Sequence, residues 1–111
     1  MNTKKIANTL KLIVQLLSQR QFETLYALDE EKKLPAEDMP EFIDDYGGVI
    51  TMPKNDQWDY DFYGIEGTEE VFIDYELFVD DKPSDLTLQC KLVERGHEEH
   101  YPFSIQSIHI L

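Results

Sequence analysis

The sequence predicts an α+β protein, with three helices followed by a curved antiparallel sheet of four or five strands. Two observations carry this prediction. Apolar residues recur with helical spacing as far as Tyr46, and from Val49 onward the spacing changes to the alternation that is typical of strands. β-branched and aromatic residues also become frequent after this point. Helices that pack on one face of a sheet bury both apolar surfaces, so we expect a two-layer fold.

The first helix is predicted from an apolar stripe near the start of the chain. Its members fall on one helix face: Ile6, Leu10, Ile13, Val14 and Leu17. Thr3 is the expected N-cap residue of this helix. A second, short helix is expected over 22–28, where apolar residues resume after a polar stretch.

A third helix is expected over 39–46. Asp38 and Glu41, three residues apart, form a capping-box pattern at its start. Gly47 follows the last residue of this segment and is expected to end the helix, because glycine readily adopts the conformation of a C-terminal cap.

Five later segments show strand patterns, at 49–52, 60–65, 71–79, 86–92 and 101–110. In the third and fourth, alternate residues are apolar and define the face that meets the helices. This inward set is Val71, Ile73, Tyr75, Leu77, Val79, Leu86, Leu88, Cys90 and Leu92. It offers only one hydroxyl and one thiol, so the sequence predicts a dry, filled interior.

The 71–79 and 86–92 segments are expected to form a hairpin. Its turn is expected within 80–85, which is rich in turn-forming residues. A register that places Leu77 opposite Leu88 also places Asp74 opposite Lys91. Apolar side chains then pair on one face of the hairpin, and opposite charges pair on the other.

The last predicted strand changes its apolar face partway along. Ile105 and Ile108 differ in parity, so they cannot both point inward from a regular strand. A β-bulge near Gln106 and Ser107 would restore the inward direction and bend the sheet.

Charge is distributed unevenly along the 111 residues, which hold 23 acidic and 10 basic side chains for a formal net charge of −13. Residues 1–28 hold four basic and one acidic residue, whereas residues 29–111 hold six basic and 22 acidic ones. Because hydrophobic residues make up 41% of the chain, this negative charge belongs to a folded surface. We expect one domain over 1–111 that attracts a basic protein and binds neither nucleic acid nor membrane directly.

The sequence favours a cytoplasmic location. Cys90 is the only cysteine, so no internal disulfide is available and a reducing compartment fits. The apolar run over 6–17 is interrupted by polar residues and precedes no cleavage-site pattern, so it is expected to be a helix and not a signal peptide. No run reaches the roughly 20 apolar residues of a membrane span.

Two segments resemble metal-binding patterns, but both lack required ligands. His97–His100 offers two histidines in an expected loop without a third ligand at motif spacing. Asp59–Glu70 matches part of a calcium loop, yet Tyr63 occupies a ligand position and the flanks have strand patterns. Cys90 points to the predicted core, where a thiol is unreactive. Because the chain has so many acidic residues, close carboxylate pairs arise by chance, and no particular pair indicates a catalytic site. We expect no metal, no cofactor and no enzymatic activity.

The residues expected to contact a partner combine negative charge with aromatic area. A first group surrounds the second predicted strand: Asp56, Trp58, Asp59, Tyr60, Asp61, Glu69 and Glu70. A second group lies in the central hairpin: Asp80, Asp81 and Asp85. Aromatic residues are enriched at interface hot spots, although the same residues could simply cover the end of the sheet.

Three segments, Asp45–Gly47, Ser84–Leu88 and Ile105–Leu111, carry a resemblance to small bacterial α+β proteins. The chain also resembles the immunity proteins encoded beside contact-dependent growth inhibition toxins. Its element order is similar to cystatin-like or NTF2-like cone folds. The resemblance implies a cytoplasmic protein that binds and blocks a toxin domain, often a nuclease with a cationic cleft, and it assigns no functional residue.

The leading hypothesis is therefore a non-enzymatic immunity protein, whose acidic surface blocks the basic active-site cleft of a cognate toxin. An alternative is an NTF2-like domain that binds or converts a small molecule in a pocket between helices and sheet. That alternative requires polar groups that point into the apolar layer. A third hypothesis, a mimic of DNA that blocks a nucleic-acid-binding protein, shares the electrostatics of the first and differs in its partner.

Overall fold

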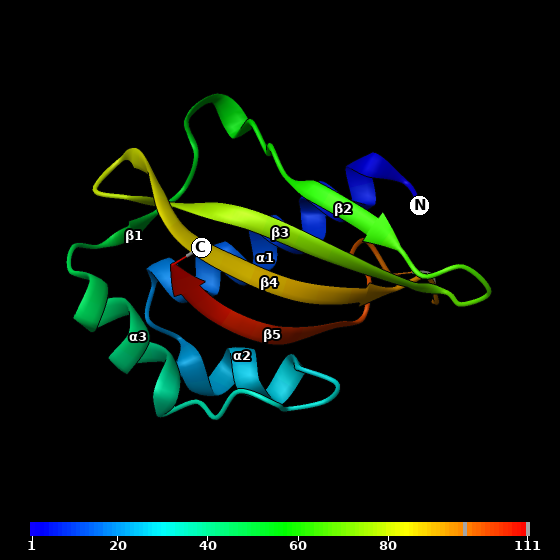
Figure 1. Ribbon diagram of the computed structural model, residues 1–111, viewed down its shortest axis with the longest axis horizontal. Helices are drawn as coiled ribbons and strands as arrows, with labels where there is room; N and C mark the ends of the chain where they lie inside the picture. The colour runs from blue at the N-terminus through cyan, green and yellow to red at the C-terminus, as the bar shows by residue number, and fades with distance from the viewer. Residues whose placement is uncertain (97, 111) are drawn as a thin grey trace.

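The structure is a computed structural model that describes residues 1–96 and 98–110. Within these residues, three α-helices precede five strands (Figure 1). The elements are α1 (Thr3–Ser18), α2 (Phe22–Leu28), α3 (Asp38–Tyr46), β1 (Ile50–Thr51), β2 (Asp61–Gly64), β3 (Glu70–Val79), β4 (Lys82–Val93) and β5 (Phe103–Ile110), with a short 3₁₀ turn, η1 (Lys54–Asp56). The predicted α+β class is confirmed.

The five strands form one antiparallel sheet that curls into a half-barrel. β4 pairs along one side of β3, and β5 pairs with β4 at the edge of the sheet. β1 and β2 share the other side of β3, β1 at Phe78 and Val79 and β2 from Val71 to Asp74. The chain leaves the sheet between β1 and β2, and the returning segment forms one wall of a hollow at the sheet.

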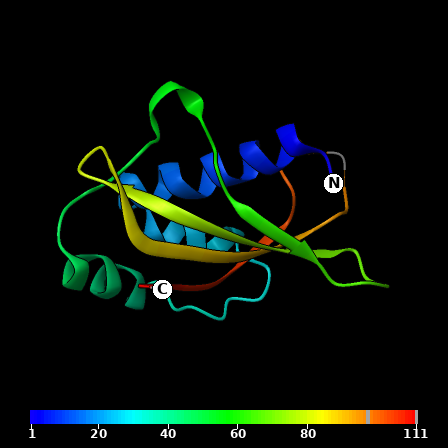
Figure 2. The same ribbon diagram turned by 45° about the horizontal axis from the view of Figure 1, so that its top comes forward.

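α1 lies behind the sheet in Figure 1, and Figure 2 shows it along one side of the curled strands. α2 and α3 lie beyond the β5 edge in Figure 1. The predicted stripe of α1 is confirmed, because all five of its apolar residues are buried in the core. The inward set of the sheet is also confirmed, with Val71 and Val79 half-buried and the other seven residues buried.

The predicted cap of α1 is wrong by one residue. Asn2, not Thr3, is the N-cap residue, and its Oδ1 accepts hydrogen bonds from the N–H groups of Lys4 and Lys5. Asparagine and threonine both serve as N-caps, and the first helical turn begins at Thr3 itself.

The predicted capping box of α3 is also wrong. Asp38 is already the first helical residue, and Glu37 before it has helical backbone angles and makes no capping hydrogen bond through its side chain. The end of α3 is predicted correctly. Gly47 has φ of 93°, a backbone conformation that favours glycine over other residues.

The register of the central hairpin is wrong by two residues. Tyr75 lies opposite Leu88, and Asp74 lies opposite Gln89, not Lys91. A shift of two residues keeps every side chain on its predicted face, which explains why the inward set is right while the pairing is not.

The hairpin turn accounts for this shift. Asp80 and Asp81, with φ of 51° and 65°, form a tight two-residue turn, and Val79 pairs directly with Lys82. β4 therefore begins at Lys82, within the segment that was expected to be a loop. A register irregularity between Glu76 and Phe78 adjusts the pairing farther along the hairpin.

The predicted bulge in β5 is confirmed. Gln89 pairs with Ser107 and Cys90 pairs with Ile105, which leaves Gln106 as the extra residue. β5 begins at Phe103, two residues later than predicted. The expected first residue of the strand, Tyr101, instead contacts α1, because its N–H donates to Thr9 Oγ1 at 2.8 Å.

Candidate partner-binding site

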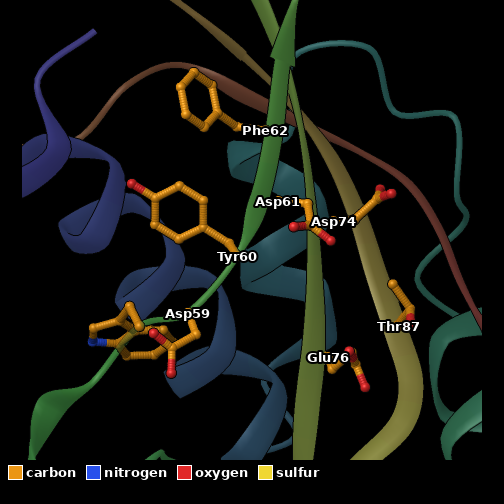
Figure 3. Close-up of a pocket in the computed structure, with 8 residues that line it drawn as sticks. Asp59, Tyr60, Asp61, Phe62, Asp74, Glu76 and Thr87 are labelled. Carbon is orange, nitrogen blue, oxygen red and sulfur yellow. The ribbon is translucent and has the colours of Figure 1, made fainter.

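Four of the predicted partner-binding residues line one hollow at the sheet, which we call the acidic hollow (Figure 3). Its volume is about 500 Å³, within the range of ligand-binding pockets. It is lined by Trp58, Asp59, Tyr60, Asp61, Phe62, Asp74, Glu76 and Thr87. The chain that leads into β2 forms one wall, and β3 and β4 form the other. Four lining residues are acidic and none is basic.

The carboxylates of the acidic hollow come from neighbouring strands. Asp61 on β2 lies directly opposite Asp74 on β3, and Glu76 follows two residues later on the same face of β3. Within the described residues, no ion pair joins these three side chains to a basic group. The hollow therefore presents negative charge that the protein itself does not neutralise.

Asp74 gives a second indication that the acidic hollow lacks a positively charged partner group. Its Oδ1 atom is buried and has no hydrogen-bond partner within the described part of the chain. Buried polar atoms are nearly always hydrogen-bonded, and a buried acceptor without a partner costs about 1–3 kcal/mol. A cationic group that enters the hollow could donate to this oxygen.

Aromatic rings form the rest of the hollow. The Trp58 ring lies 5.3 Å from the Tyr75 ring, which belongs to the buried core, and Trp58 Nε1 donates to Asp56 Oδ1 at 2.9 Å. Tyr60 and Phe62 make an edge-to-face contact at 6.3 Å, and the Phe62 side chain is 60% exposed. Aromatic faces beside carboxylates suit the binding of guanidinium and ammonium groups.

Asp56 is placed beside the hollow and not in it. Besides the bond from Trp58, its Oδ1 lies 3.8 Å from Lys11 Nζ on α1. Both side chains of this ion pair are more than half exposed. The contact of Asp56 with the indole indicates that it orients Trp58.

Burial and charge act together on Tyr75. Burial, and then the negative charge of Asp59, raise the pKa of the Tyr75 hydroxyl to about 12. This hydroxyl also has no hydrogen-bond partner within the described residues. Tyr75 therefore stays neutral and supports Trp58 from the core side.

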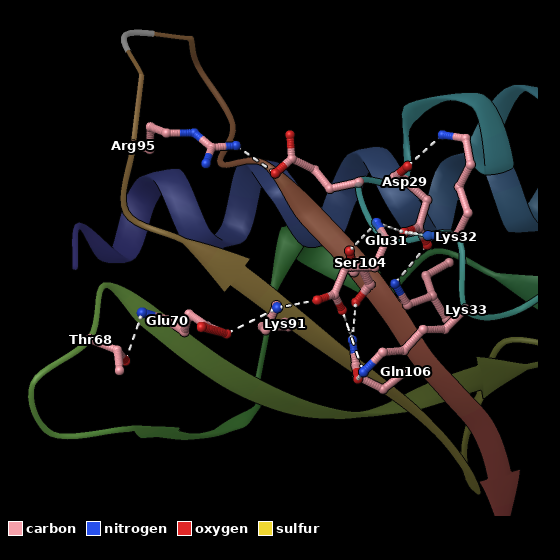
Figure 4. Close-up of polar contacts among 12 residues, drawn as sticks. Asp29, Glu31, Lys32, Lys33, Thr68, Glu70, Lys91, Arg95, Ser104 and Gln106 are labelled. Atoms are coloured by element: carbon pink, nitrogen blue, oxygen red, sulfur yellow. Dashed lines mark hydrogen bonds and ion pairs between the residues drawn. The ribbon is translucent and has the colours of Figure 1, made fainter.

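Glu69 and Glu70 lie apart from the acidic hollow, in a mixed-charge cluster (Figure 4). Lys91 Nζ lies 2.5 Å from Glu31 Oε2 and 3.0 Å from Glu70 Oε2, and only 14% of its side chain is exposed. The hydrogen bond from Lys91 lowers the pKa of Glu31, and the same bond raises the pKa of Lys91. Glu70 is thus paired within the protein.

The second predicted group, Asp80, Asp81 and Asp85, lies at the far end of the central hairpin and holds neighbouring elements. Asp80 Oδ1 accepts the Val49 N–H at 3.0 Å. Asp85 Oδ1 accepts the Tyr46 hydroxyl at 2.8 Å, and this bond raises the pKa of Tyr46. Asp81 completes the turn. The structure does not bring this group together with the acidic hollow.

Sequence reasoning missed Asp74, Glu76 and Thr87 as parts of the site, and it did not include Phe62 among the expected contact residues although Phe62 belongs to the same aromatic segment. The alternation of β3 did place Asp74 and Glu76 on the outward face. The pairing of β2 with β3 brings Asp61 opposite Asp74, and this long-range contact has no signature in the sequence.

Neither Cys90 nor the calcium-like segment has the geometry that its candidate chemistry requires. Burial raises the pKa of the Cys90 thiol to about 12, with further contributions from the charges of Asp74 and Asp29. The calcium-like segment forms β2 and the turn into β3 instead of a loop between helices. His97 lies outside the described residues, and within those residues no cluster of three His, Cys, Asp or Glu side chains could hold a metal ion.

Fold and site together define a small α+β domain whose sheet bears a hollow of carboxylates and aromatic rings. Residues 14–111 match the model of a family described as "Domain of unknown function (DUF7668)", and the chain belongs to that family. Comparison with curated proteins and with solved structures finds no match. Across residues 1–96 and 98–110, no helix has the length and apolar character to cross a membrane.

Proposed function

We propose that the protein is an immunity protein that binds and neutralises a cognate bacterial toxin domain, a nuclease, through the acidic hollow. One observation carries the proposal: Asp61 and Asp74 lie opposite each other on β2 and β3 without a basic partner, in a hollow that aromatic rings also line. A nuclease cleft holds Lys and Arg side chains that contact phosphates. Carboxylates in the hollow would take the place of those phosphates and exclude the substrate.

Arginine is the side chain that best fits the hollow. Its planar guanidinium group donates several hydrogen bonds in a fixed fork, pairs with carboxylates and stacks on aromatic rings. Asp61 and Asp74 supply the carboxylates, including the unpaired Asp74 Oδ1, and the exposed Tyr63 ring, stacked on Phe72, lies on the same face of these two strands. This mode of action needs no catalysis, no cofactor and no direct contact between the protein and nucleic acid.

The net charge supports fast capture of a basic partner. Attraction between opposite charges raises association rate constants from about 10⁵–10⁶ to roughly 10⁸–10⁹ M⁻¹ s⁻¹ at low salt. A net charge of −13 on 111 residues creates such a field around the whole protein. An immunity protein in the cytoplasm benefits because the toxin must be bound before it reaches its substrate.

The proposal predicts that a neighbouring gene encodes a basic toxin domain, and that domain is the partner used in the test. We expect Asp61→Asn and Asp74→Asn to raise the dissociation constant by about tenfold or more and to weaken protection of cells from the toxin. Glu37→Gln and Glu94→Gln remove the same charge from exposed positions outside the hollow and serve as matched controls. An unchanged dissociation constant in both hollow variants would remove the hollow from the interface.

The finer architecture also stays a proposal, namely a cystatin-like or NTF2-like cone with the helices against one sheet face. The position of α1 behind the curled sheet supports it. The small-molecule alternative requires polar groups in a cavity on that face. Leu77, Leu88 and Cys90 are fully buried there, which favours a filled interior and the binding of a protein partner.

A further inference from the structure

A second hollow lies between α3 and β5, and we call it the apolar groove. Its volume is about 610 Å³, and its apolar and aromatic lining residues include Leu34, Phe42, Tyr46, Ile108 and Ile110. Phe42 is 41% exposed and Ile110 is 59% exposed. Large apolar side chains exposed around one concavity are typical of a binding site.

The groove runs beside the edge of the sheet. The first half of the β5 edge is covered, because Phe103 O accepts the Glu30 N–H at 2.9 Å and Asp29 Oδ2 accepts the Ile105 N–H at 2.8 Å. Over 107–110, the described residues provide backbone pairing only on the β4 side. Such an edge can accept a further strand.

We propose that the apolar groove binds an extended apolar segment of a partner, flanked by basic residues, which pairs with the 107–110 edge of β5 as an added strand. In this mode of recognition, backbone hydrogen bonds give affinity and alternate side chains enter pockets. The edge supplies the backbone groups, and the exposed side chains of Phe42 and Ile110 supply the apolar pocket.

The negative charge around the groove determines which residues are favoured at the two ends of the bound partner segment. α3 carries four acidic residues and no basic one, and Asp45 of this helix lines the groove. The C-terminal end of α3 adds a partial negative charge through the helix dipole. Basic flanks are therefore favoured. A second copy of the chain is disfavoured as the occupant, because each copy brings a net charge of −13.

The proposal goes beyond toxin binding at the acidic hollow and is tested separately. The probe is a fluorescent peptide of alternating Val and Thr residues with two Lys residues at each end, followed by anisotropy. We expect it to bind about tenfold or more tightly than a peptide with the same core and Glu ends. A proline in the core should abolish binding, because proline cannot donate to a strand.

Variants of the protein show where on its surface the peptide probe binds. Phe42→Ser should weaken binding of the Lys-flanked peptide by about tenfold or more, whereas Ile65→Ser and Glu94→Gln, at exposed positions outside both the groove and the acidic hollow, should leave it unchanged. Ile110→Ser, at a 59% exposed position, is the second groove variant if Phe42→Ser fails to fold. Amide shifts of 107–110 in NMR spectra should follow the titration.

Four results would overturn the proposal. The first is equal binding of Lys-flanked and Glu-flanked peptides, and the second is binding that survives both groove variants. The third is a dimer in sedimentation experiments that Phe42→Ser dissociates, because a second copy would then be the occupant. The fourth is loss of peptide binding in Asp61→Asn alone, which would assign the probe to the acidic hollow, so failure of this proposal differs from failure of the proposed function.

Discussion

Asp61 on β2 lies directly opposite Asp74 on β3, two carboxylates in register without a basic residue to separate them. Like charges opposite each other on adjacent strands destabilise a sheet. Proteins commonly keep such costs where binding requires them. We infer that a guanidinium or ammonium group of the partner supplies the missing positive charge, so the pair is unfavourable in the free protein and favourable in the complex.

Neutralising one member of this pair should stabilise the free protein. We expect Asp61→Asn to raise the free energy of unfolding by about 0.2–1 kcal/mol, measured by urea denaturation at low salt. The gain should shrink as salt is added, because salt screens the repulsion. Glu37→Gln, which lies outside the hollow, controls for the change in net charge. A loss of stability in Asp61→Asn would show that the pair is not repulsive.

The buried Asp29 should be essential for stability, because it connects the loop after α2 to β5 (Figure 4). Its Oδ1 accepts the N–H groups of Glu31 and Lys32, and its Oδ2 accepts that of Ile105. Asp29→Ala leaves these donors without this acceptor and should lower the free energy of unfolding by about 2–4 kcal/mol. Glu23→Ala, on the exposed face of α2, should have little effect. Equal urea midpoints for the two variants would contradict this role.

Asp81 should tolerate glycine better than Asp80 does. Both residues have positive φ, which costs less for glycine than for aspartate. Asp81→Gly should therefore raise stability by about 0.5–1 kcal/mol in thermal or urea unfolding. Asp80→Gly relieves the same backbone strain but removes the carboxylate that accepts the Val49 N–H. Its gain in stability should therefore be smaller. A larger gain in stability for Asp80→Gly than for Asp81→Gly would contradict these roles of the two turn residues.

The Glu31–Lys91 contact should make part of the stability depend on pH. The bond from Lys91 lowers the pKa of Glu31 in the folded protein, so its stabilisation is present above the unfolded pKa of about 4.3 and is lost as pH falls through the lower folded value. Glu31→Gln should be less stable than the wild type near neutral pH. We expect the two urea midpoints to converge as the pH falls below the unfolded pKa and through the lower folded one, and a gap that does not narrow would contradict the coupling.

The sequence predicted those parts of the fold that depend on local periodicity. The stripe of α1 and the inward faces of β3 and β4 follow from residue spacing, and the bulge at Gln106 follows from a change of parity. The hairpin register did not follow, because an Asp80–Asp81 turn with two positive φ angles lacks the glycine that normally marks it.

Only the part of the candidate site that lies in β2 and the segment before it could be predicted from the sequence. Trp58, Asp59, Tyr60 and Asp61 are neighbours in sequence, so their combination of charge and aromatic area could be seen directly. Their partners on β3 depend on pairing between segments that are separated by a turn. Glu69 and Glu70 are close to these residues in sequence, but they lie at the start of β3, in the mixed-charge cluster around Lys91.

The most direct test of electrostatic capture by the acidic hollow measures how fast the proposed partner, a basic toxin domain, associates with the protein as ionic strength rises. Trp58 is the only tryptophan and lines the acidic hollow, so its emission reports binding there. Between about 0.01 and 0.15 M ionic strength the screening length falls from about 30 to 8 Å. The rate constant should fall by about tenfold or more for the wild type, and clearly less for a variant that combines Asp59→Asn and Asp61→Asn. A rate constant that does not change with salt would contradict capture by opposite charge.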